Sequence, residues 1–167
     1  ILPSLITLAW KSPRGDYFRT EVFAALKVLQ QTKMQPADLK GSWAGAMGQC
    51  QFMPSSYLAY AKDGDGDGKA DIWTNEDDVF ASTATYLKAK GWKAGQPWRV
   101  ELAAPVNTQG VTINARGLSE PKPLSEWLAR GAKAAKGGSL KDLPKYAPTR
   151  VYEPEPGGPV FILGPNF

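Results

Sequence analysis

Apolar positions recur at helical spacing in the first half of the chain. The clearest stripe lies within residues 16–32 and consists of Phe18, Val22, Ala25, Leu26 and Leu29. Residues three and four apart share one face of a helix, so this stripe predicts an amphipathic helix that packs against a core.

Three further segments predict helices. Residues 3–10 are apolar, with Pro3 in the first turn, where proline is tolerated. A short helix is expected from Pro54 to about residue 61. A longer one is expected over residues 76–90, because Thr74 or Asn75 can cap its start and a glycine follows its end.

The pattern changes after residue 92. Segments 98–102, 110–115 and 160–163 predict short strands between turns rich in proline and glycine, and 124–131 fits one more short helix. The predicted fold class is mainly α (α+β): a helical domain with a small β-containing C-terminal portion. We expect residues 1–167 to form a single domain, without a second independent one.

The amino-acid composition limits which side chains can catalyse a reaction or bind a metal. The chain has no histidine, which excludes a Ser-His-Asp triad and a histidine zinc site within it, and Cys50 is its single cysteine. Acid–base chemistry must therefore use carboxylates, tyrosines or lysines. The net charge of +4 gives mild attraction to anionic polymers; nucleic acid is one possibility, although the basic residues are scattered and form no dense block. No apolar run reaches the roughly 20 residues that span a membrane.

Both ends have unusual character. The chain starts at Ile1-Leu2-Pro3 with no targeting segment, and its last residues are apolar. We expect a domain core that is truncated at both ends.

Residues 63–71 form a candidate metal loop. The loop matches positions 1, 3, 5, 6, 7 and 9 of the EF-hand pattern, in which carboxylates and the backbone carbonyl of position 7 bind calcium; these positions are Asp63, Asp65, Asp67, Gly68, Lys69 and Asp71. The glutamate of position 12 is replaced by a threonine. Asp77 or Asp78 would have to supply the fourth acidic ligand in a loop that extends over 63–78. One loop without a pair predicts a structural calcium ion, while a solvated acidic turn is the alternative.

Residues 48–54 place amides and an aromatic among glycines, ahead of the short helix. The side chains of Gln49 and Gln51 both donate and accept hydrogen bonds, which suits sugar hydroxyls and N-acetyl groups. Phe52 and Tyr86 are candidates to stack on sugar rings. Aromatic residues near helices more often pack in the core, and that alternative stays open.

The chain resembles the membrane-bound lytic murein transglycosylase B family over essentially its whole length, most specifically at residues 41–92. The residues that carry the resemblance are Gly41-Ser-Trp-Ala-Gly-Ala-Met-Gly48, Gln51-Phe-Met-Pro-Ser-Ser-Tyr57, Asp71-Ile-Trp73 and Gly91-Trp92. The resemblance implies a lysozyme-like fold, peptidoglycan glycan strands as substrate, an EF-hand-like calcium site and a periplasmic location in the bacterial cell envelope. It also implies a monomer, with any outer-membrane lipid anchor outside this chain.

The resemblance further implies the reaction. One glutamic acid protonates the glycosidic oxygen between N-acetylmuramic acid and N-acetylglucosamine, and the muramyl 6-hydroxyl then attacks to give a 1,6-anhydro product. In the family that glutamate lies upstream of the position of Ile1, so the catalytic residue is unknown within this chain. Glu21 is not assigned the role, since a solvated or paired helix glutamate is commoner.

Several substrate and metal residues carry over from the family position by position. Ser42, Gln51 and Tyr86 match positions in the cleft, and Arg14 matches a basic residue that meets the glycan or its peptide stem. Pro13 replaces the family's second arginine. For calcium, the three aspartates, the Lys69 carbonyl and Asp78 match. Two other functions remain open: a non-catalytic peptidoglycan-binding module stabilised by calcium, and a calcium-responsive interaction protein.

Overall fold

Four helices and the loops between them make up residues 1–90. They are α1 (Leu2–Lys11), α2 (Gly15–Thr32), α3 (Pro54–Tyr60) and α4 (Glu76–Ala89). The computed structural model describes residues 1–141, 143 and 147–167. The chain divides into two compact units, Ile1–Lys90 and Gly91–Phe167. All four predicted helices are present, with ends within two residues of those expected.

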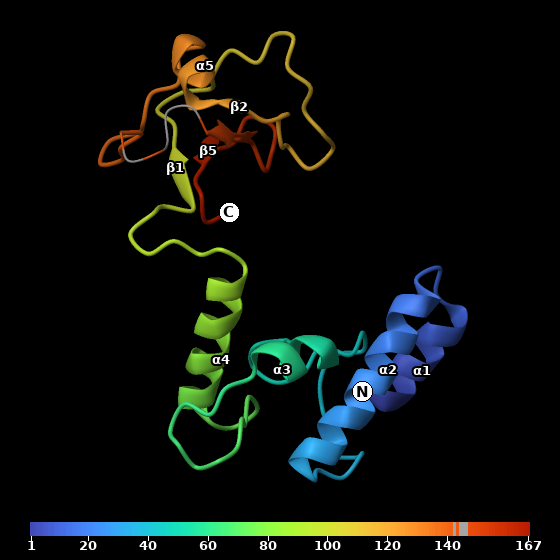
Figure 1. Cartoon of the computed structure of the whole chain (residues 1–167). Coiled ribbons are helices and arrows are strands. Elements are labelled where there is room, and N and C mark those ends of the chain that lie inside the picture. The colour runs from blue at the N-terminus through green and yellow to red at the C-terminus, as the bar shows by residue number, and fades with distance from the viewer. Residues whose placement is uncertain (142, 144–146) are drawn as a thin grey trace. The chain divides into compact units, whose positions relative to one another are not determined.

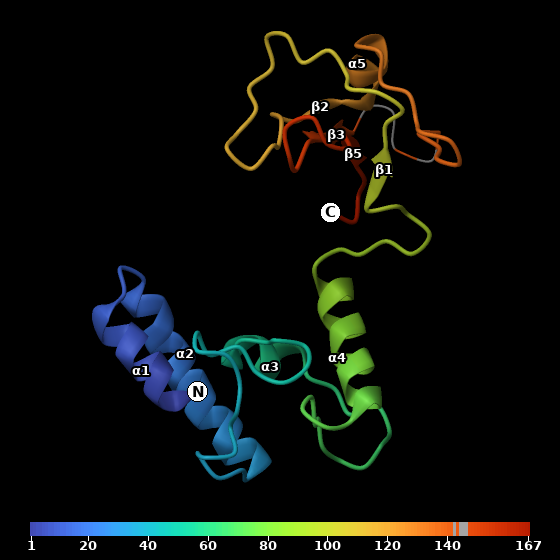
Figure 2. The same cartoon turned by 180° about the vertical axis from the view of Figure 1, so that it is seen from behind.

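Local sequence explains where these helices begin. Pro3 lies in the first turn of α1. Of the two candidate caps for α4, Asn75 is the one used: its side chain accepts hydrogen bonds from the backbone N–H groups of Asp77 and Asp78. Both views show α1 and α2 lying side by side as an antiparallel pair (Figures 1 and 2).

The first unit has its own hydrophobic core. Its buried members are Leu5, Phe18, Ala25, Val28, Leu39, Met47, Phe52, Tyr57 and Ile72. The predicted stripe of α2 is mostly correct, but Leu26 is 48% exposed. The buried face of α2 instead follows Phe18, Glu21, Ala25 and Val28, which leaves Leu26 at its margin.

The second unit combines short strands with one helix. Strands β1 (Arg99–Glu101), β5 (Phe161–Leu163) and β4 (Val151–Tyr152) form an antiparallel sheet in the order β1-β5-β4, and β2 (Lys122–Pro123) pairs with β3 (Pro148–Thr149). Helix α5 spans Leu124–Ala129. Central strand β5 pairs with β1 on one edge and β4 on the other, and it is buried at all its positions. Figure 1 shows this unit in yellow to red.

The strand predicted over 110–115 is wrong. In this segment Ile113 makes an isolated bridge to Ser119, and Asn114 closes a turn by accepting hydrogen bonds from the N–H groups of Arg116 and Leu118. Asparagine side chains favour such local turns over a ladder of strands. Within the described residues, no helix is both long and apolar enough to cross a membrane.

The predicted fold class is confirmed: the chain is mainly helical, and its strands are small and lie in the C-terminal portion. Each unit also has a separate hydrophobic core, and the two sets of core residues do not overlap. The expectation of one domain over residues 1–167 concerns how the units join, and it stays a prediction.

Candidate functional site

The loop between α2 and α3 is built around a buried methionine. Met47 is fully buried and pairs with Phe52 through backbone hydrogen bonds in both directions, of 2.8 and 3.1 Å. Between them Gly48 adopts φ +60°, and a side chain added there would collide with Ile72. Gln51 follows at φ +50°. The tight turn therefore holds Gln51 on the surface directly beside Phe52.

A groove of about 390 Å³ opens beside this turn, within the size range of small-ligand sites. Its lining consists of Cys50, Gln51, Phe52, Met53, Ser56, Thr83, Tyr86 and Leu87. All of these side chains are uncharged. The Phe52 and Tyr86 rings contact each other with centroids 5.4 Å apart. The Gln51 amide nitrogen donates to the Gly48 carbonyl, at 2.9 Å.

Three of the six predicted sugar-binding residues line this groove: Gln51, Phe52 and Tyr86. Phe52 is only 6% exposed, so the core alternative accounts for most of its ring. Sequence reasoning missed Cys50, whose sulfur lies 3.5 Å from the Thr83 hydroxyl and 3.5 Å from the Val79 carbonyl. These contacts join the turn to α4.

The other three predicted residues lie outside the groove lining. The Ser42 hydroxyl accepts a hydrogen bond from the Ala46 N–H, 3.1 Å away, within the preceding turn. Gln49 donates to the Trp73 carbonyl, at 3.2 Å. The Arg14 guanidinium lies 4.4 Å from the centre of the Tyr17 ring. Their predicted roles in binding substrate stay predictions.

Glu21 is 2% exposed and has a clear partner. Its two carboxylate oxygens accept from the backbone N–H of Ser55, at 2.9 Å, and from the Ser55 hydroxyl, at 2.6 Å. Ser55 lies in the first turn of α3, where backbone N–H groups lack partners within the helix. Glu21 is therefore a paired glutamate that joins α2 to the start of α3.

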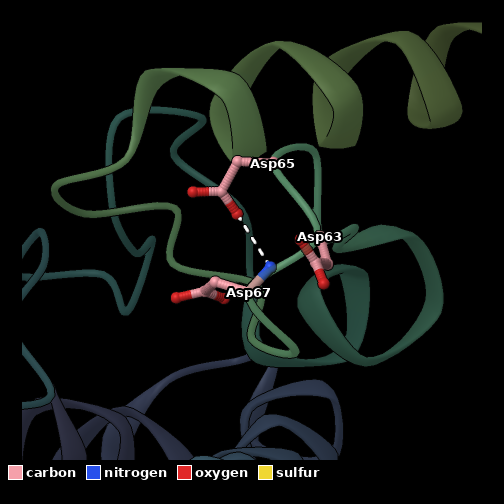
Figure 3. Close-up of side chains that lie close together, drawn as sticks. All are labelled: Asp63, Asp65 and Asp67. Atoms are coloured by element: carbon pink, nitrogen blue, oxygen red, sulfur yellow. Dashed lines mark hydrogen bonds between the residues drawn. The ribbon is translucent and has the colours of Figure 1, made fainter.

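The predicted metal loop gathers its three acids. Asp63, Asp65 and Asp67 can each place a carboxylate oxygen within 4.8 Å of the others. Figure 3 shows the three side chains around one turn, with the Asp67 N–H donating to Asp65. Oxygens that share one calcium ion at about 2.4 Å each lie at most about 5 Å apart. The spacing of this donor set therefore fits calcium.

Backbone hydrogen bonds hold these carboxylates in place. The N–H groups of Gly68 and Gly66 donate to Asp63 at 2.8 and 2.6 Å, and these bonds lower the pKa of Asp63 from its ordinary value. The Asn75 amide donates to Asp65, at 2.7 Å. These bonds thus favour the ionised form of the Asp63 carboxylate, which is the form that a cation requires.

Asp78 has a different place from the three clustered acids. It is fully buried, and its two carboxylate oxygens accept from the N–H groups of Gly64 and Asp71, each at 2.6 Å. It thereby ties both sides of the loop to the start of α4. Asp77 is exposed and lies outside the cluster as well. The predictions that Asp78 and the Lys69 carbonyl bind calcium stay predictions.

A larger cavity, of about 860 Å³, lies beside this loop and contains none of the predicted sugar-binding residues. Its lining includes Asp63 and Lys69 from the loop, Met34 after α2, and the aromatic rings of Tyr57 and Trp73. The Tyr57 hydroxyl donates to the Ala70 carbonyl, at 2.8 Å, which fixes one wall of the cavity.

Comparison with known proteins finds similar sequences and solved structures among the lytic transglycosylases. A membrane-bound lytic murein transglycosylase B from Escherichia coli (strain K12) is 46% identical over 132 residues, which is 78% of this chain and 35% of the relative. The structure of SltB3 from Pseudomonas aeruginosa in complex with NAG-NAM-pentapeptide matches with a TM-score of 0.79 at 40% identity, over 99% of this chain and 44% of that one.

A further solved relative is the Escherichia coli lytic transglycosylase Slt35 in complex with calcium, with a TM-score of 0.77 at 31% identity, over 98% of this chain and 49% of that one. These matches confirm the predicted lysozyme-like fold. The chain spans less than half the length of each of these relatives. Residues 1–167 match the family model described as Transglycosylase SLT domain, and the chain therefore belongs to this transglycosylase family, as its resemblance predicted.

Proposed function

We propose that this chain is the core of a lytic transglycosylase that cleaves the β-1,4 bond between N-acetylmuramic acid and N-acetylglucosamine in peptidoglycan. The observation that carries the proposal is the open groove in which Gln51 lies beside Phe52 and Tyr86. An exposed amide next to aromatic rings suits an amino sugar, whose N-acetyl group both donates and accepts hydrogen bonds. Family membership and the relatives' names support the same activity.

The proposed reaction uses one carboxyl group twice. A glutamic acid upstream of Ile1 protonates the glycosidic oxygen, and its carboxylate then takes a proton from the muramyl 6-hydroxyl as that oxygen attacks the anomeric carbon. The product is a 1,6-anhydro-muropeptide. The groove lining contains no carboxylate, and Glu21 is engaged by Ser55, so neither offers this acid. Within this chain, the residues of the groove bind and orient the glycan.

The lack of a carboxylate in the groove lining also favours the second candidate, a peptidoglycan-binding module without catalysis. Sacculi digested with the full gene product separate the two functions, with mass spectrometry as the readout. We expect anhydro-muropeptides. Intact sacculi that retain the bound protein would instead support the binding module, and products with free reducing ends would indicate hydrolysis.

Binding to the groove can be tested on this chain alone. Gln51→Ala should weaken binding of a GlcNAc-MurNAc peptide about tenfold in calorimetry, which is the loss of one or two hydrogen bonds. Gln30→Ala is the matched control, because Gln30 is an exposed glutamine on α2 that does not line the groove. Equal binding by the parent and the Gln51 variant would refute the assignment of Gln51.

We also propose that calcium binds at Asp63, Asp65 and Asp67, with the Lys69 carbonyl and Asp78 as further ligands. The fit of the clustered carboxylates and the calcium named for Slt35 support this. Bound calcium would neutralise the acids and fix the loop between α3 and α4. Its role is structural, since the groove lining and the loop share no residue.

We further propose a location in the bacterial periplasm, as a monomer, with any lipid anchor outside this chain. The relative named membrane-bound lytic murein transglycosylase B supports an envelope location. Fractionation of cells that express the tagged full gene product would test the location, and light scattering of the chain would test the monomer.

A further inference from the structure

Helix α4 presents one continuous face to the groove. Thr83, Tyr86 and Leu87 line the groove, and Lys90 follows Thr83 by seven residues and Tyr86 by four. At 100° per residue these side chains share one face, and Lys90 falls in direction between Tyr86 and Leu87. The groove-lining face of α4 therefore continues into a lysine at the end of the helix.

Contacts of the ammonium agree with this placement. Lys90 Nζ lies 5.4 Å from the centre of the Tyr86 ring and 5.8 Å from that of Tyr60. These two rings meet edge to face, with centroids 5.3 Å apart. Tyr86 itself lines the groove, so the charge sits next to a groove wall. Among the described residues, no acid forms an ion pair with Lys90.

This charge stands out because the groove lining is neutral. Arg14, which the sequence predicted to meet the glycan or its peptide stem, stacks over the rings of Tyr17 and Phe18 and is absent from the lining. Lys88 is near Lys90 in sequence but points to a different side of α4, about 160° away from it. Lys90 is also outside the lining, but its ammonium lies beside the ring of Tyr86, which is part of the lining, so it can meet an anionic group of a ligand bound there.

We propose that Lys90 determines specificity, by receiving a carboxylate of the peptide stem while the neutral glycan lies in the groove. This inference rests on the proposed function. In a muropeptide the lactyl carboxyl of the muramic acid is consumed in the amide bond to the stem, so the remaining carboxylates belong to the peptide. An ammonium beside Tyr86 would favour stem-bearing glycan over uncharged amino-sugar chains.

Calorimetry with this chain tests the proposal using two ligands: GlcNAc-MurNAc-pentapeptide, and the same compound with its peptide carboxylates converted to carboxamides. We expect the parent chain to bind the acidic ligand about fivefold more tightly, a typical effect for a solvent-accessible ion pair. Lys90→Gln and Lys90→Ala should abolish this preference, and Lys90→Arg should keep it. Added salt should reduce it.

Lys88→Ala is the matched control and should keep the parent's preference, while melting temperatures verify that each variant is folded. A Lys90→Gln variant that still prefers the acidic ligand, or a Lys88→Ala variant that loses the preference equally, overturns the proposal. A parent that binds both ligands equally refutes only the role of Lys90. A parent that binds neither refutes the proposed function, and the role of Lys90 with it.

Discussion

Glu21 shows how one buried carboxylate can set the geometry of a neighbouring helix. Because Ser55 lies in the first turn of α3 and the groove residue Met53 directly precedes that helix, the two hydrogen bonds from Ser55 hold the entry to α3. A carboxylate at a helix start also interacts favourably with the helix dipole. Glu21 therefore supports the groove wall from inside without touching it.

Glu21→Ala should lower the free energy of unfolding by about 3 kcal/mol, because it leaves a cavity in place of a buried side chain and removes both hydrogen bonds from Ser55. Ser55→Ala removes only the hydroxyl and should cost about 1 kcal/mol. Denaturant titration followed by circular dichroism measures both. Glu76→Ala, at an exposed acid in the first turn of α4, is the control and should change little. A loss for Glu21→Ala no greater than for this control would contradict the argument.

The sequence identified part of the groove, and the part it missed has a simple cause. Gln51 and Phe52 were found because an amide that donates and accepts hydrogen bonds and an aromatic ring that can stack on a sugar stand out in a segment rich in glycine. Thr83 and Leu87 carry no such signal, although their helical spacing from Tyr86 places all three on one face. Glu21 did carry a signal, since it falls within the buried face of α2, where a charged residue needs a partner.

At the scale of elements, the acidic loop between α3 and α4 should respond to metal. The parent chain should melt at a higher temperature in calcium than with a chelator, because a cation relieves repulsion among three carboxylates. Asp67→Ala should remove most of that difference while changing the melting temperature with chelator little. Scanning calorimetry of the parent and of the Asp67→Ala variant, each with calcium and with chelator, measures these melting temperatures. Identical melting curves for the parent with calcium and with chelator would remove the metal proposal.

Glu126 of α5 interacts with two cations outside the helix, Lys122 of β2 and Arg130, which follows the last helical residue. Lys122 and Arg130 lie 2.9 and 3.3 Å from the carboxylate of Glu126, and the hydrogen bond from Lys122 is the main cause that lowers the pKa of Glu126 below 4.5. A lowered pKa in the folded state stabilises the fold above the ordinary pKa, and this contribution is lost as pH falls through the folded pKa.

Glu126→Gln should therefore be less stable than the parent near neutral pH, by a small amount because solvent still reaches these partly buried groups and screens their charges. The difference should shrink as the pH falls through the lowered pKa of Glu126, because the parent's carboxyl is then protonated as well. Urea titrations at several pH values measure this. A difference that is constant with pH would show that the loss has another origin.

The elements also show which patterns are readable from sequence. Helices of 10, 18 and 14 residues contain several turns, so their periodicity and caps fixed their ends closely. The strands are two or three residues long, too short to show an alternating pattern. Strands β2, β3 and β4 were missed for this reason. Segment 110–115 was mistaken for a strand because Val111 and Ile113 alternate with polar residues, although only an isolated bridge forms there.

At the scale of the whole molecule, the sequence does show a change of character after Trp92, where helical periodicity gives way to short apolar segments between turns. It does not show that the apolar residues on each side of that point gather into separate cores. The core of the second unit joins residues as distant as Val100 and Ile162, which pair through β1 and β5. Such long-range pairing follows from sheet register, and segments this short specify register weakly.

Because the two cores share no residue, a cavity made in one should first loosen the unit that contains it. Leu5→Ala and Ile162→Ala each remove a fully buried side chain and should cost about 3 kcal/mol. In hydrogen exchange followed by mass spectrometry, Leu5→Ala should increase exchange mainly within Ile1–Lys90, and Ile162→Ala mainly within Gly91–Phe167. Both variants are needed, since each serves as the control for the other. Equal loss of protection in both units from either substitution would show that the chain opens as one cooperative body, and would favour the single domain that the sequence predicted.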